Sequence, residues 1–198
     1  MKRMMMAAAL FLAVSIASAQ DDTDTDARFR VGVAAAFSDY KGDPTLPIDD
    51  SALGVQLYAQ AKLNSWFGVE GGYYSSGEFE SNLSPNSTTC TPPEFCDAGV
   101  EFKGFSLTAV GYLPIGGDDS DIDFYGKIGA YNFDIEMSQR IGSSTVPGSL
   151  GSSSGLTAGA GAVINVGDNI GVRTEFDYYD VENTEHLWTL AMGLEYRF

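Results

Sequence analysis

The stretch WTLAMGLEYRF, from Trp188 to Phe198, decides the fold of this chain. Every second residue is apolar or aromatic, and the residues between them are small, polar or charged. The apolar set consists of Trp188, Leu190, Met192, Leu194, Tyr196 and Phe198. A strict period of two places the two sets on opposite faces of a β-strand. One continuous apolar face is typical of a transmembrane β-barrel strand, which faces lipid on one side and the barrel interior on the other.

The amino-terminal residues carry the features of a secretory signal peptide. Lys2 and Arg3 form a basic start, an apolar run follows, and Ala17-Ser18-Ala19 predicts cleavage after Ala19. The apolar run is too short for a membrane-spanning helix, which needs ~20 residues, and we expect no such helix later in the chain. The sequence therefore predicts a cleaved signal peptide over residues 1–19 and one exported barrel domain over residues 20–198.

Seven further stretches alternate in the same way or are rich in glycine and alanine. Together with the carboxyl-terminal stretch they predict strands at about residues 28–37, 52–63, 67–74, 100–113, 122–134, 156–165, 170–179 and 188–198. Tilted strands of ~9–11 residues cross a bilayer. The sheet must close, because an open edge would leave unpaired amides in hydrocarbon. We expect an all-β fold, an eight-stranded antiparallel up-and-down transmembrane β-barrel.

The predicted connections alternate in length along the chain. Residues 64–66, 114–121 and 166–169 form short links, and residues 38–51, 75–99 and 135–155 form long ones. Short periplasmic turns and long extracellular loops are the mark of barrels in the bacterial outer membrane, where we expect this protein to reside. An even number of strands places both ends of the barrel domain on the periplasmic side.

The charge of the chain excludes one class of partner. The formal net charge is −16, and without Lys2 and Arg3 it is near −18. Binding to a phosphate backbone needs basic residues, so nucleic acid is not an expected partner.

The two cysteines, Cys90 and Cys96, lie close together in one predicted loop. An exported chain meets an oxidising compartment, so a local disulfide between them is the expected state. Two cysteines and one distant histidine are too few ligands for a zinc site.

Two acidic runs, at residues 22–26 and 119–123, have the D-x-D-x-D spacing of a calcium loop. Such a loop needs glycine at its sixth position and glutamate at its twelfth. Ala27 and Phe124 stand at the sixth positions, so neither run fits. We expect solvated acidic segments, no metal site and no cofactor.

His186 is the only histidine, and by strand parity it faces lipid near the outer rim. Lipid-modifying barrel hydrolases hold a His–Ser pair in that region. No serine follows His186 in its strand, and its outward neighbours Tyr178 and Asp180 supply no hydroxyl nucleophile of the usual kind. We expect no enzymatic activity, and a lipid-modifying enzyme is the weaker alternative.

Several short stretches resemble the transmembrane domain of the outer membrane protein A family and other small porin-family barrels. The stretches are GYLPI at residues 111–115, DIDFYGKIG at 121–129, GVEGGY at 68–73, RTEF at 173–176 and GLEYRF at 193–198. The resemblance implies that Tyr196 and Phe198 belong to a carboxyl-terminal signal that the outer-membrane assembly machinery reads.

The barrel interior is the candidate functional site. An eight-stranded barrel has a lumen that side chains fill, and charges there must pair or meet water. Parity points Glu70, Lys127, Arg173 and Glu175 inward. The resemblance implies that Glu70 and Arg173 occupy positions of an ion-pair network that gates slow ion passage. A lysine that the family pattern has in the fourth strand is Val110 here.

Two readings of the function follow. The first is a non-enzymatic outer-membrane barrel that contributes to envelope integrity or surface interaction through its extracellular loops. The alternative is a narrow, low-conductance channel for ions or small solutes. The expected partners are outer-membrane lipids including lipopolysaccharide, the outer-membrane assembly machinery, and a host or surface ligand at the loops. We expect a monomer.

Overall fold

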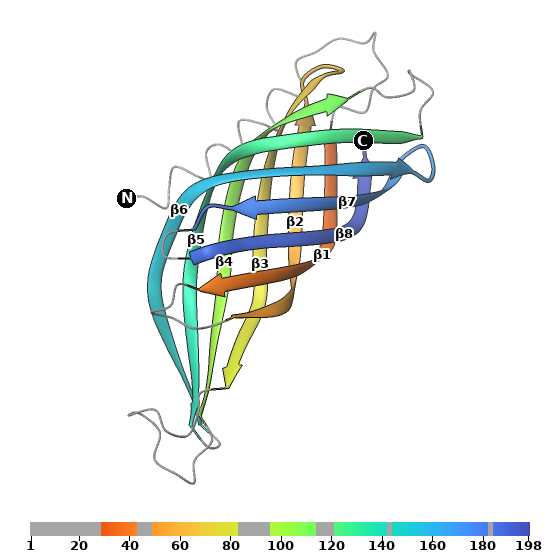
Figure 1. Cartoon of the computed structure of the whole chain (residues 1–198). Coiled ribbons are helices and arrows are strands. Elements are labelled where there is room, and N and C mark those ends of the chain that lie inside the picture. Colours follow the sequence, from red (N-terminus) through yellow and green to blue (C-terminus); the bar gives the residue numbers. More distant parts are fainter. Residues whose placement is uncertain (1–28, 43–48, 83–95, 114–120, 142–143, 182–183) are drawn as a thin grey trace.

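The alternating stretches pair with their sequence neighbours into a closed barrel of eight antiparallel strands, as the computed structural model shows (Figure 1). The structure describes residues 29–42, 49–82, 96–113, 121–141, 144–181 and 184–198. The strands are β1 (Phe29–Gly42), β2 (Asp49–Lys62), β3 (Phe67–Asn82), β4 (Cys96–Leu113), β5 (Ile122–Ile141), β6 (Ser144–Asn165), β7 (Ile170–Tyr179) and β8 (Thr184–Arg197). The expected fold class is confirmed. No helix within the described ranges is long and apolar enough to cross a membrane.

The first and last strands close the barrel. β1 pairs with β8 from Arg30↔Arg197 to Lys41↔His186, and its other edge pairs with β2. The carboxyl-terminal stretch that predicts the fold is therefore the strand that completes it. Closure satisfies the backbone groups that an open edge would expose to hydrocarbon.

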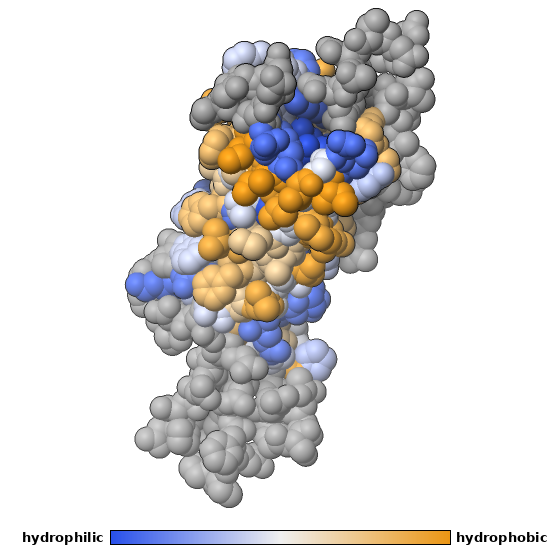
Figure 2. All heavy atoms as spheres, turned by 90° about the vertical axis from the view of Figure 1, so that its right-hand side faces the viewer, coloured by the Kyte–Doolittle hydropathy of each residue, from blue (hydrophilic) through white to orange (hydrophobic). Residues whose placement is uncertain are grey.

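Outward side chains form an apolar belt around the barrel. Leu107 is 54% exposed, Ile128 is 62% exposed and Met192 is 63% exposed, whereas the intervening Ala191 is buried. Figure 2 shows hydrophobic side chains gathered into a band on one face, with hydrophilic side chains above and below it. The predicted alternation between a lipid face and a lumen face is confirmed.

Aromatic side chains lie near both ends of this belt. At the end that carries the carboxyl terminus, Trp66 is exposed in the β2–β3 turn, and the rings of Tyr196 and Phe198 lie 4.9 Å apart. Toward the other end, the Trp188 ring lies 6.1 Å from that of Phe37 and also contacts Phe176. Amphipathic rings at these levels anchor a barrel at the membrane interfaces.

Apolar residues change face along β4 and β5. Within the belt, Phe105 and Ile128 point outward, but further along the same strands Phe102 and Phe133 point inward and are buried. In this part of β4 and β5, beyond the belt, the outward side chains are polar or charged, as at Asp134. The pattern becomes that of a sheet in water, so apolar side chains fill the barrel instead of meeting lipid.

The four strands β3 to β6 continue beyond the rest of the barrel, toward the lower end in Figure 1. We define the projecting sheet as residues 76–82 of β3, 96–103 of β4, 134–141 of β5 and 144–153 of β6. Its strands pair across the whole width; for example, Glu101 is opposite Glu136, which is opposite Ser149.

The projecting sheet corrects the expected loop lengths. The expected loop at residues 135–155 is almost entirely strand, because β5 continues to Ile141 and β6 starts at Ser144. The expected loop at residues 75–99 likewise contributes to β3 and β4. Beyond the lipid the outward side chains need not be apolar, so no lipid-facing apolar stripe marks these strands in the sequence.

Two β-bulges bend the projecting sheet away from the barrel wall. In β3 the register shifts between Ser75 and Glu78, and Gly77 there has a φ of 74°. A side chain at Gly77 would begin 2.4 Å from the Leu53 carbonyl oxygen, so this position needs glycine on both counts. In β6 a second shift accompanies Gly151, whose φ is 114°. Bulges of this kind increase local twist and curvature.

The interior has two levels. The level beside the projecting sheet, which we call the aromatic layer, consists of Tyr40, Tyr74, Phe79, Phe102, Phe133 and Tyr179, all buried. The Tyr40 and Phe102 ring centroids lie 5.1 Å apart, and those of Phe133 and Tyr179 also lie 5.1 Å apart. The second level, nearer the carboxyl terminus, is polar and holds the candidate site.

Candidate functional site

Strand parity places the candidate residues inside the barrel. Glu70 lies on β3, Lys127 on β5, and Arg173 and Glu175 on β7, each between two outward positions. All four side chains are buried, with at most 6% of any residue exposed. Charged groups this deep must be paired, because an isolated buried charge costs several kcal/mol.

The structure brings these four residues together. Arg173 Nη1 lies 2.7 Å from Glu70 Oε2, and Arg173 also donates hydrogen bonds to Glu175. Lys127 Nζ lies 2.6 Å from Glu175 Oε1 and 3.3 Å from Glu70 Oε1. Ion pairs thus link these two cations and two carboxylates, and we call them and the residues that contact them the lumenal network.

Arg173 is held on both faces as well as at its edge. Its guanidinium carbon lies 4.0 Å from the centroid of the Tyr58 ring and 4.6 Å from that of Tyr125. Stacking of this kind adds a cation–π contribution to the ion pairs and fixes the orientation of the planar group. The position therefore suits arginine specifically.

Sequence analysis missed the neutral members of the network. Gln60 donates a hydrogen bond to Glu70 and accepts one from Tyr112, and Tyr125 donates to Glu175 at 2.6 Å. Gln56 donates to Glu175. Parity alone marks these residues as inward. Which residues they meet depends on strand tilt and stagger, which the sequence does not reveal.

A third carboxylate completes the surroundings of Lys127. Asp177 Oδ1 lies 3.1 Å from Lys127 Nζ, so the ammonium group faces Glu70, Glu175 and Asp177 at once. Lys127 is the central cation of this part of the lumen.

The network continues toward the end that carries the carboxyl terminus. Glu195 is fully buried and lies 3.2 Å from both Arg30 and Arg197, and Arg173 approaches it at 3.9 Å. Arg30 also contacts Asp123 at 3.4 Å. In the polar level of the interior, buried cations and carboxylates therefore alternate and neutralise one another.

Val110 occupies the interior where the family pattern has a lysine. It is fully buried and packs in a small apolar cluster with Tyr112, Tyr125 and Val163. An ammonium group at this point would meet aromatic and aliphatic side chains. The apolar cluster gives a physical reason for the departure from the family pattern.

The arrangement fills the lumen with paired charges. Its carboxylates are ion-paired, and the aromatic layer covers them on the side of the projecting sheet. In the described part of the chain, no group of three or more His, Cys, Asp or Glu side chains is arranged so that it could hold a metal ion. Removing one partner of such a buried pair leaves an uncompensated charge and costs ~3–5 kcal/mol, so each member of the network depends on its partners.

The remaining candidates lie partly outside the described residues. Cys90 lies outside the described residues, and Cys96 is the first residue of β4, so the disulfide between them stays a prediction. His186 is opposite Lys41 in the ladder between β1 and β8, and nothing is described of its side chain. The Phe198 N–H donates to the Phe29 carbonyl at 3.0 Å, so backbone pairing continues to the last residue.

Comparisons with known proteins agree with this architecture. A family model for the outer membrane protein beta-barrel domain matches residues 6–198. A comparison with curated protein sequences found no match. Among solved structures, Ail, the attachment invasion locus protein of Yersinia pestis, is 19% identical with a TM-score of 0.57, over 86% of this chain and 97% of that one.

Two further solved structures share the fold. Ail in complex with the heparin analogue sucrose octasulfate is 17% identical with a TM-score of 0.53, over 86% of this chain and 96% of that one. The outer membrane protein OprG from Pseudomonas aeruginosa is 15% identical with a TM-score of 0.53, over 86% of this chain and 95% of that one.

Proposed function

The chain belongs to the outer membrane protein beta-barrel domain family, and on that premise we propose that it is a non-enzymatic surface protein whose projecting sheet meets a ligand outside the cell. The observation that carries the proposal is the length of β5 and β6, which have 20 and 22 residues. Crossing a bilayer takes ~9–11 residues, so about half of each strand stands clear of the lipid. Phe29 and Phe198, the first and last described residues of the barrel, lie together at the opposite end, which we assign to the periplasmic side, and the sheet therefore points outward from the cell.

A sheet of this kind is a costly feature unless it is used. Its strands need glycine-marked bulges at Gly77 and Gly151, and an aromatic layer supports it from inside. Rigid scaffolds that present surface elements are a common basis for binding. Surface interaction therefore accounts for the projecting sheet, whereas envelope integrity alone requires only the belt.

The filled interior supports the absence of transport and catalysis. Each of the buried carboxylates Glu70, Glu175 and Asp177 is ion-paired with Lys127. An ion-paired group beneath an aromatic layer is not placed to act on an external substrate. The second candidate is a narrow low-conductance channel. The polar level of the interior supports it, but conduction requires the aromatic layer to open.

The ligand class differs from the one in the sucrose octasulfate complex of Ail. That ligand is a sulfated polyanion, whereas the outward face of this projecting sheet carries Glu78, Glu101, Asp134 and Glu136 against Lys103. Repulsion between like charges opposes binding of a polyanion there. We propose a partner that is not sulfated.

The further parts of the proposal concern processing and assembly. We propose that residues 1–19 are cleaved, that Cys90 and Cys96 form a disulfide, and that the protein inserts as a monomer among lipids that include lipopolysaccharide. Export to an oxidising compartment supports the disulfide. Tyr196 and Phe198 serve as the signal for the assembly machinery.

A shortened hairpin tests the proposed function. Glu136 and Ser149 are directly opposite, so Asn-Gly can replace residues 137–148 as a two-residue turn. Attachment of intact cells to epithelial monolayers, mucin and polystyrene is compared between the two proteins at equal surface amounts. We expect the shortened variant to lose attachment to at least one surface, and Asp168→Asn in the periplasmic turn to change nothing. Equal attachment of wild type and shortened variant to every surface contradicts the proposal.

A further inference from the structure

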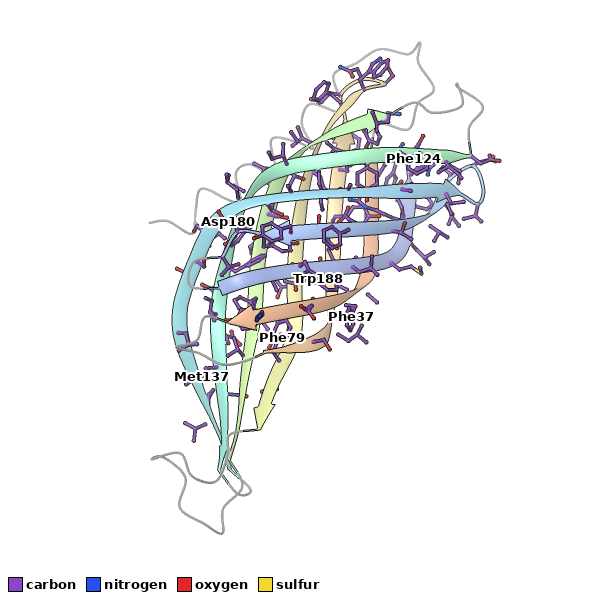
Figure 3. The ribbon with its side chains drawn as sticks, in the orientation of Figure 1. Phe37, Phe79, Phe124, Met137, Asp180 and Trp188 are labelled. Atoms are coloured by element: carbon purple, nitrogen blue, oxygen red, sulfur yellow. The ribbon has the colours of Figure 1, made fainter. Side chains whose placement is uncertain are left out.

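The outward face of the projecting sheet is hollowed into a groove. The cavity measures about 570 Å³ and is lined by Glu78, Gly99, Glu101, Asp134, Glu136, Met137, Ser138, Pro147, Gly148 and Ser149. The volume falls in the range of ~300–1,000 Å³ that is usual for ligand pockets. Figure 3 places Met137 on the projecting part of β5, well away from the belt residues Phe124 and Trp188.

Glycine contributes to the lining of the groove at two positions. An added side chain at Gly99 would begin within 2 Å of the Glu78 carboxylate, at 1.9 Å from its Oε1, and so would displace it. Gly148 on β6 also lines the groove, so glycine contributes from two strands. The absence of a side chain at Gly99 therefore lets the Glu78 carboxylate lie across β4 at the groove.

The acidic walls come from one row across the sheet. Glu78 is opposite Glu101, and Glu101 is opposite Glu136, so three glutamates stand side by side on neighbouring strands. Like charges directly opposite one another destabilise a sheet. A cation beside the row offsets this cost, as Lys103 does at Glu101 and Glu136, and a cationic partner would offset more of it.

One ammonium group of the chain already contacts two of the lining carboxylates. Lys103 Nζ lies 2.8 Å from Glu101 Oε2 and 3.0 Å from Glu136 Oε2. Hydrogen bonds with Glu101 and Glu136 raise the pKa of Lys103 above its usual value. The contact shows which chemical group this face of the sheet takes. With Lys103 counted against Glu78, Glu101, Asp134 and Glu136, these five described side chains have a net charge of −3.

The groove stands above the lipid and is open to a partner. Lys103 lies two residues beyond Phe105, the last outward aromatic residue of β4 in the belt, or ~7 Å along the strand. Glu101 and Gly99 lie further out on the same strand. No lysine or arginine belongs to the described residues that line the groove.

We infer that the groove binds a cationic segment of a partner protein, whose lysine or arginine side chains pair with Glu78, Asp134 and Glu136. The inference rests on the proposed function, since it names the chemistry of the partner that the projecting sheet meets. Charge complementarity and the resident Lys103 contact favour a protein segment with ammonium or guanidinium groups. The size of the groove suits several side chains rather than one ion.

The test uses the full-length mature protein, refolded in a neutral detergent, and a fluorescein-labelled oligolysine peptide. Fluorescence anisotropy gives the affinity at low and at physiological ionic strength. We expect Glu78→Gln and Glu136→Gln each to weaken binding about fivefold or more, which corresponds to the loss of one favourable ion pair in the groove. Lys103→Gln should tighten binding severalfold, because it removes the resident competitor.

Asp180→Asn is the matched control, since it removes one exposed carboxylate outside the groove. Unchanged affinity in this variant, with the opposite effects of Glu78→Gln and Lys103→Gln, supports the inference. An equal loss in Asp180→Asn means that oligolysine responds only to net charge, and this overturns it. The inference is also overturned if a labelled Gly-Ser peptide binds with the same affinity as oligolysine, or if the protein binds Mg²⁺ but does not bind oligolysine.

The attachment assay separates this inference from the proposed function. Loss of attachment in the shortened hairpin, with full attachment in Glu78→Gln and Glu136→Gln, overturns the cationic partner and leaves surface interaction standing. Specific oligolysine binding together with attachment that does not depend on the hairpin supports the groove and contradicts the proposed cellular role.

Discussion

Arg173 on β7 and Glu70 on β3 meet inside the barrel, with 2.7 Å between Nη1 and Oε2, although 102 intervening residues separate them in the sequence. Both come from inward positions, and Arg173 reaches across the lumen to make the contact. The pair ties opposite walls of the barrel together. Its contribution can be measured separately from that of the backbone ladder.

Arg173→Ala should lower the free energy of unfolding by ~3 kcal/mol, because it leaves Glu70 and Glu175 with only Lys127 as a buried cation. Combined with Glu70→Ala, the cost should be smaller than the sum of the two single costs. Urea unfolding of the protein in lipid vesicles measures both. Lys103→Ala removes an exposed pair and should cost well under ~1 kcal/mol. Additive costs for Arg173→Ala and Glu70→Ala would show that the pair does not couple.

The aromatic layer should control conductance. Phe133→Ala removes a fully buried ring that contacts Tyr74 and Tyr179, and it should cost ~3–5 kcal/mol. Because both levels fill the bore, Arg173→Ala alone should not raise single-channel conductance in a planar bilayer. Arg173→Ala together with Phe133→Ala should raise it. Steady conductance of the wild-type protein at the level of that double variant would instead favour the channel.

The folded barrel should migrate differently from the boiled protein on a denaturing gel. Detergent does not open a closed hydrogen-bond ladder until heat does, because every strand is paired on both sides within the belt. Samples refolded in detergent are run with and without boiling. Spectroscopic evidence of β-structure provides the control for refolding. Identical mobility of a verified folded sample would contradict the closed barrel.

The sequence predicts the belt well because lipid imposes a strict rule on it. The expected bounds of the strand at residues 170–179 coincide with those of β7 (Ile170–Tyr179), where each outward position is apolar or uncharged. The inward positions of Glu70 and Arg173 follow from the same parity. Within the bilayer, side-chain chemistry therefore reports strand direction residue by residue.

Beyond the lipid this rule ends, and sequence reasoning loses the strands with it. Residues 144–155 are mostly serine and glycine, with no alternation to mark a strand, yet they pair with β5. A signal was present in β4, where Phe102 and Phe105 occupy opposite parities. The change of phase marks the level at which the apolar face turns from lipid to the interior. The contact of Gln60 with Tyr112 depends on barrel stagger and could not be predicted.

Deletion of Phe198 should reduce insertion into the outer membrane far more than deletion of residues 20–24. Phe198 donates its N–H to the Phe29 carbonyl, and its ring contacts Tyr196, so the last residue is part of the seam between β8 and β1. The resemblance of Tyr196 and Phe198 to a carboxyl-terminal assembly signal gives the same direction. Heat-modifiable protein in outer-membrane fractions measures insertion. Phe198→Tyr keeps an aromatic ring and the backbone bond, so it should insert nearly normally. Equal insertion of the two deletion variants would remove both the seam and the signal as reasons for Phe198, and it would leave closure of the barrel to the preceding pairs of β8.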